Sequence, residues 1–182
     1  MAKIPLATDA ELTPEVRQVI DGLPPLNIFR MLANAPANLK PFVEWGLSVL
    51  FRTELDPRDR EIAILRVAHV TRSKYEWAQH ATIARRVGVT DDEMAAIATK
   101  GPVTGLGADG NLLCRVADEI TRDVRLSDDA LAAILMRYGK RQAMELILNV
   151  SHFNMVSRIL ESTRVELEAE NVLENHPLPE MR

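Results

Sequence analysis

The chain has 182 residues, of which 47% are hydrophobic and 26% are charged, a composition typical of a globular domain with its own core. The net charge of -4 and the lack of a long lysine or arginine block argue against nucleic acid or an anionic membrane as a partner. With a single cysteine, no signal-peptide pattern and no apolar run near the ~20 residues of a membrane span, we expect a cytoplasmic protein.

Helical periodicity recurs along the sequence and strand alternation is nearly absent, so the predicted fold class is all-α. Residues 1–25 contain several prolines and are predicted to form an N-terminal arm. A first helix is expected to end at Pro36, because proline disfavours helical geometry in the residue before it. The next helix is predicted over residues 38–55, with Pro41 in its first turn, where proline is tolerated.

The following segment has the clearest helix-start signal in the chain. Asp56 is a good N-cap and Pro57 suits the first helical position. This helix is predicted to run to a break at residues 72–73. A second helix is predicted over residues 75–87, since Gly88 is of the type favoured just beyond a helix end.

The second half of the chain is also predicted to be helical. Thr90 and Glu93 form a capping box that starts a short helix, and residues 100–110 form the clearest loop. Ser127 is predicted to cap a helix that stops at Gly139. We expect one helical domain over residues 1–182, with halves at 26–99 and 111–170, a long last helix within 141–168 and a C-terminal arm at 171–182.

Four residues with chemically useful side chains, Tyr75, Glu76, Trp77 and His80, stand close together at the start of the second of these helices. Glu76 and His80 are four residues apart and share a helix face. A carboxylate beside an imidazole is a proton-transfer pair, because the imidazole titrates near neutral pH. The alternatives are a surface ion pair for Glu76 and His80, and core packing for Tyr75 and Trp77.

The preceding helix places Glu61 at the head of a mostly apolar face. It could serve the same histidine or merely favour the helix dipole. In the simplest antiparallel hairpin, Glu61 and His80 would lie at opposite ends. His69, His152 and Cys114 are interpreted as packing or surface residues. No zinc or di-iron spacing is present, so no metal site is expected.

These motifs give the sequence a resemblance to a known family. Arg60-Glu61, then "ILRVA", then "YEWAQHATIARRVGVTDDEMAAI" resemble the carboxymuconolactone decarboxylase family, within the alkylhydroperoxidase-D-like superfamily. The resemblance implies an alkylhydroperoxidase-D-like helical bundle. It also implies assembly into trimers or hexamers, with active sites near subunit contacts.

The peroxidase branch of that superfamily uses a glutamate, a histidine and a Cys-x-x-Cys pair. The resemblance places the glutamate at Glu61 and the histidine at His80, and the two cysteine positions at Ser73 and Glu76. Cys114 alone cannot replace a dithiol that cycles through a disulfide. Peroxidase activity by that mechanism is therefore excluded.

The decarboxylase branch keeps the glutamate and the histidine without the thiols. The resemblance implies a cofactor-free decarboxylase acting on a small carboxylated lactone or a related acid. His80 would donate the proton, with Glu61 or Glu76 orienting it. The expected substrate-binding residues are Tyr75, Trp77, Arg72 and Ser73. The alternative is a non-catalytic or stress-related oligomeric protein that has lost its redox dithiol.

Overall fold

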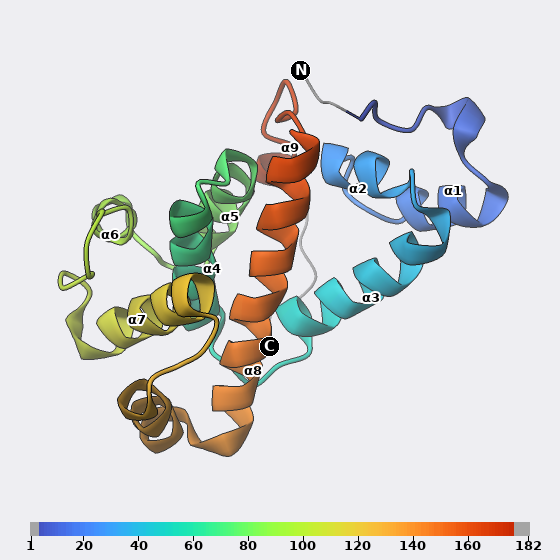
Figure 1. Cartoon of the computed structure of the whole chain (residues 1–182). Helices are drawn as coiled ribbons and strands as arrows, with labels where there is room; N and C mark the ends of the chain where they lie inside the picture. The colour runs from blue at the N-terminus through green and yellow to red at the C-terminus, as the bar shows by residue number, and fades with distance from the viewer. Residues whose placement is uncertain (1–3, 177–182) are drawn as a thin grey trace.

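The computed structural model describes residues 4–176 (Figure 1). These residues form helices joined by loops, and no β-strand occurs among them. None of the described helices is long and apolar enough to cross a membrane. The helices are, in chain order, the 3-10 helix η1 Asp9–Glu11, α1 Pro14–Asp21, α2 Asn27–Leu32, α3 Pro36–Phe51, α4 Pro57–Thr71, α5 Lys74–Arg86, α6 Asp91–Ile97, α7 Gly107–Asp123, α8 Asp128–Thr163 and α9 Val172–Asn175.

The predicted helix starts are confirmed where a side chain caps the helix. The Asp56 carboxylate accepts hydrogen bonds from the backbone N–H groups of Arg58 and Asp59. Thr90 and Glu93 form the predicted capping box at α6. The predicted stop at Gly139 is present as a sharp break inside α8, where φ is 68° and ψ is 177°, a conformation that glycine adopts at little steric cost.

Three predictions near prolines and glycines were wrong in detail. Pro36 begins α3 instead of ending the helix before it, because its missing N–H is not needed at the first helical position. Pro41 therefore lies inside α3 and not in its first turn. The predicted loop at residues 100–110 is shorter than expected, since α7 already begins at Gly107.

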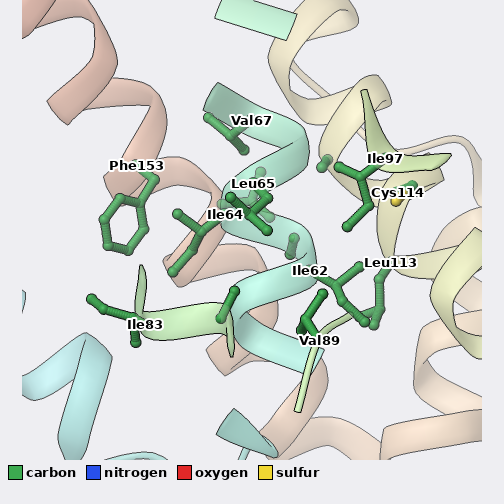
Figure 2. Close-up of a cluster of buried hydrophobic side chains, with 14 of the residues drawn as sticks. Ile62, Ile64, Leu65, Val67, Ile83, Val89, Ile97, Leu113, Cys114 and Phe153 are labelled. Atoms are coloured by element: carbon green, nitrogen blue, oxygen red, sulfur yellow. The ribbon is translucent and has the colours of Figure 1, made fainter. Parts of the chain in front are cut away.

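Helix α4 lies at the centre of the molecule and packs against α5, α6, α7 and α8 (Figure 1). Nine consecutive residues, 60–68, are buried, which means that α4 is enclosed on all sides. Figure 2 shows its side chains, Ile62 and Leu65 among them, meeting Phe153 on one side and Leu113 on the other. Any polar side chain on this stretch must therefore find its partners inside the protein.

Arg66 meets that requirement completely. Its Nε and Nη2 donate to the two carboxylate oxygens of Asp118 on α7, each at 2.8 Å. Nη1 and Nη2 donate also to the carbonyls of Ile97, Thr99 and Gly101, at 2.7 to 2.8 Å. All five guanidinium N–H groups are thus bonded, and they connect α4 to α7 and to the chain after α6.

The described parts of both predicted arms pack against the helices. At the N-terminal end, Ala7 and Val16 form a small second core with Leu39 and Val43 of α3. At the C-terminal end, residues 171–176 lie along α5, where Asn171 Nδ2 donates to Thr82 Oγ1 at 2.9 Å. Residues 1–3 and 177–182 of these arms lie outside the described residues.

We expect Arg66→Met to lower the free energy of unfolding by about 3–5 kcal/mol, because it removes one partner of a buried ion pair and leaves Asp118 with less compensation. Urea unfolding at pH 7 measures this loss. Arg85→Met is the matched control, since Arg85 pairs with Asp91 on the exposed surface and should cost less than about 1 kcal/mol. Equal losses in the two variants would contradict the role given to Arg66.

Candidate active site

A cavity of about 520 Å³ lies between α2, α3, α5 and α8, within the size range of small-molecule sites. Its wall is mostly apolar. Phe29, Phe42, Leu47, Ile83, Phe153 and Val156 are among its lining residues. The polar side chains on the wall include Tyr75, Glu76, Gln79, His80 and His152. Four of these five come from the predicted Tyr75–His80 segment and its helix α5.

His80 is held by Glu61, which lies 19 residues earlier on α4. His80 Nδ1 is 2.8 Å from Glu61 Oε2. Glu61 is fully buried and the His80 side chain is 9% exposed. The carboxylate accepts a hydrogen bond from Nδ1–H, so Nε2 is the ring nitrogen that remains for a molecule in the cavity. Of the two alternatives for Glu61, contact with this histidine is the one that the structure shows, although the simplest antiparallel hairpin would hold the two residues apart.

Arg60 stands next to this pair. Its Nε is 3.7 Å from Glu61 Oε1, and its side chain is 1% exposed. Burial lowers the pKa of Arg60, while the charge of Glu61 opposes that shift. Glu61 therefore has a guanidinium on one side and the imidazole on the other.

Glu76 is the second carboxyl group of the site, but it does not contact His80 by a hydrogen bond. Its Oε2 accepts from Ser157 Oγ on α8 at 2.5 Å, and Ser157 Oγ accepts from Thr71 Oγ1 at 2.9 Å. Burial raises the pKa of Glu76 well above its usual value, with smaller contributions from Glu161 and Glu61. The surface-pair interpretation of Glu76 and His80 was wrong, because both are buried.

His152 is the site residue that the sequence interpretation missed. Its ring lies among aromatic side chains, 5.6 Å from Phe42 and 5.0 Å from Phe153 between centroids. Burial, aided by His80, lowers the pKa of His152 to about 4. A Cβ atom at Gly46 would lie 3.4 Å from His152 Nε2, so the absent side chain leaves room for the imidazole. The aromatic neighbour Phe153 was the available signal.

The four expected substrate-binding residues divide between the cavity and other places. The Tyr75 ring lines the cavity, but its hydroxyl donates to Glu168 Oε1 at 2.5 Å. Trp77 packs against His69, with ring centroids 6.4 Å apart. Arg72 is exposed and caps the end of α4, while Ser73 is buried at the start of α5. Trp77, Arg72 and Ser73 do not line this cavity.

Glu168, on the chain after α8, holds one wall in place. Besides the Tyr75 hydroxyl, its carboxylate accepts from Gln79 Nε2 at 2.7 Å and from the Asn27 backbone N–H at 2.6 Å. Burial and Glu168 together raise the pKa of Tyr75. Within residues 4–176, no group of three or more His, Cys, Asp or Glu side chains is arranged to hold a metal ion.

Residues 36–119 match the model of the carboxymuconolactone decarboxylase family. The resemblance to this family is confirmed over that segment. The matched residues run from α3 through most of α7 and contain Glu61, Glu76 and His80. His152 on α8 lies outside them. No curated protein matches the chain.

Three solved structures have the same fold. An alkylhydroperoxidase AhpD core, an uncharacterized peroxidase-related protein from Ralstonia eutropha JMP134, has a TM-score of 0.81 at 15% identity, over 94% of this chain and 95% of that one. An uncharacterized peroxidase-related protein from Silicibacter sp. TM1040 has a TM-score of 0.75 at 17% identity, over 92% of this chain and 94% of that one. A protein of unknown function from Agrobacterium tumefaciens has a TM-score of 0.67 at 16% identity, over 76% of this chain and 96% of that one. The predicted AhpD-like helical fold is confirmed.

We expect His152→Phe to reduce the loss of stability in acid. An unfolded histidine takes up a proton below its ordinary pKa of about 6.5, whereas folded His152 resists protonation until about pH 4. The free energy of unfolding of the wild type should thus fall by up to about 3 kcal/mol as the pH falls through this window. In the variant it should fall by less. Urea unfolding at pH 7 and pH 5 tests this. Equal acid sensitivity in both proteins would contradict it.

Proposed function

We propose that the chain is a cofactor-free enzyme, a lyase or isomerase, that moves a proton to or from carbon in a small molecule bound in this cavity. The observation that supports the proposal is the buried Glu61–His80 hydrogen bond beside the cavity. Glu61 holds one tautomer of the imidazole and stabilises its protonated form. His80 Nε2 then gives the proton to the substrate or takes it away.

Decarboxylation of a carboxylated unsaturated lactone is the form of this chemistry implied by the family resemblance. The bond to the carboxylate breaks as CO2 leaves, and its electron pair moves into the conjugated carbonyl to give a dienolate. His80 would then protonate carbon. Of the two carboxyl groups expected to orient His80, Glu61 is favoured, because Glu76 bonds to Ser157 instead. In the isomerisation of an unsaturated lactone, a base first removes a proton from carbon to give a dienolate, and protonation at another carbon completes the step without loss of CO2.

The competing candidate is a non-catalytic protein that has lost a redox dithiol. Ser73 and Glu76 occupy the positions where the peroxidase branch has cysteines, and Cys114 is fully buried on α7. Burial raises the pKa of the Cys114 thiol to about 12, which opposes thiolate chemistry. The enclosure of Glu61 and His80 beside a cavity favours the enzyme, since an isolated structural role would not need an open ring nitrogen.

We expect His80→Gln and Glu61→Gln each to lower turnover by about 10²–10⁴-fold, the usual contribution of a general acid–base group. Glutamine is used because it preserves hydrogen bonding within the buried pair. Two substrates are tested: freshly generated 4-carboxymuconolactone, followed by CO2 release and ultraviolet absorbance, and a neutral β,γ-unsaturated lactone, followed by deuterium uptake from D2O.

Cys114→Ala is the control for thiol chemistry and should turn over at the wild-type rate. Wild-type turnover of either lactone, lost in the His80 variant and kept in the Cys114 variant, is the expected result. Turnover that survives His80→Gln would contradict the assignment of His80. Failure of the wild type on both lactones would favour the non-catalytic candidate.

We propose also that the chain forms a homo-oligomer. Met144, Leu148 and Met155 lie at spacings of four and seven residues on α8 and are 38–55% exposed, so they form one apolar stripe. Leu148→Lys should lower the mass measured by light scattering after gel filtration, because a charge would have to be buried in the contact. Lys40→Glu, at an exposed site on α3, should leave the mass unchanged. An unchanged mass in Leu148→Lys would place the contact elsewhere.

A further inference from the structure

We infer that the cavity takes an uncharged, largely apolar carbonyl compound in preference to a free carboxylate. This inference names the substrate class of the proposed site. The expectation that the bound molecule carries a carbonyl group rests on the proposed function. Apolar side chains from α2, α3, α5 and α8 make up most of the wall. A molecule enclosed by such a wall loses its hydration, which is costly for an ion unless a counter-ion meets it.

The described lining residues include neither lysine nor arginine. The one arginine considered for carboxylate binding, Arg72, is exposed at the end of α4 and is not part of the wall. Arg60 is buried next to the site, but its charge is set against that of Glu61 at 3.7 Å. An entering carboxylate would thus find no lysine or arginine on the described wall, and the charge of the nearby Arg60 is already opposed by that of Glu61.

Burial disfavours the charged forms of two ionisable groups on the wall, Glu76 and His152. Burial raises the pKa of Glu76 and lowers that of His152 to about 4. The geometry agrees with both directions, since the Glu76 side chain is buried and His152 packs against Phe42 and Phe153. Neither group offers a positive charge to an anion.

Glu168 adds a negative charge to the same side of the cavity. Its carboxylate is bonded to Tyr75 and Gln79, both of which line the wall. A second carboxylate nearby would be repelled across a region of low dielectric constant. Against this background, His80 Nε2 is a polar atom of the wall that can meet a carbonyl or a carbon-bound proton.

Benzylideneacetone and cinnamate are the probes that separate the two classes. They share the same phenyl ring and double bond, and differ in a methyl ketone against a carboxylate of equal size. Binding to the full chain is measured at pH 7 by titration calorimetry. We expect benzylideneacetone to bind at least tenfold more tightly than cinnamate. Cinnamate binding as tight as that of the ketone, or no ketone binding at all, would overturn the inference.

Two variants test whether the preference for the ketone belongs to this cavity. Val156→Phe fills part of the space and should weaken ketone binding at least tenfold, with circular dichroism confirming that the variant is folded. Leu47→Lys, at a half-buried wall position, places a cation at the cavity and should tighten cinnamate binding. Ketone binding unaffected by Val156→Phe, or cinnamate binding unaffected by Leu47→Lys, would overturn the assignment.

His80→Gln separates this inference from the proposed function. The binding preference depends on the wall, so it should survive in this variant even though turnover is lost. A protein that prefers the ketone but turns over no lactone would support the binding inference and contradict the enzyme. A protein that turns over the carboxylated lactone and binds cinnamate as tightly as the ketone would do the reverse.

Discussion

Five N–H groups of one buried guanidinium hold the centre of this structure together. Arg66 bonds to Asp118 of α7, to the carbonyl at the end of α6 and to two carbonyls after it. A buried cation with any of these partners missing would cost several kcal/mol, so the positions of α4, α7 and the α6–α7 connection are fixed relative to one another. Because α4 is enclosed in this way, Glu61 is fixed five residues earlier, on the same buried helix.

The chemistry of the cavity follows from which buried groups have ionic partners and which do not. Glu61 has Arg60 and His80 beside it. Glu76 has a hydroxyl, and His152 has aromatic rings. Burial disfavours the charged forms of Glu76 and His152, whereas Glu61 has ionic partners beside it. Similar residue types on one wall therefore acquire different roles from their surroundings, a common arrangement in acid–base sites.

The fold by itself does not choose among functions. The structures that share it at 15–17% identity include peroxidase-related proteins, and one fold commonly hosts unrelated chemistries. The family resemblance puts Ser73 and Glu76 at the positions where the peroxidase branch has thiols, and Cys114 is enclosed in the core. The proposed proton transfer depends instead on the buried Glu61–His80 hydrogen bond beside the cavity.

The sequence by itself determined the helical class, the capped starts at Asp56, Thr90 and Ser127, and the segment that carries the site, because caps and periodicity act within a few residues. Only the tertiary structure decided which side chains meet. Glu61 is hydrogen-bonded to His80, Glu76 is hydrogen-bonded to Ser157, and His152 lines the cavity from a distant helix. These contacts depend on how α4, α5 and α8 pack, and helix periodicity fixes the face of a residue but not its partner across the interface.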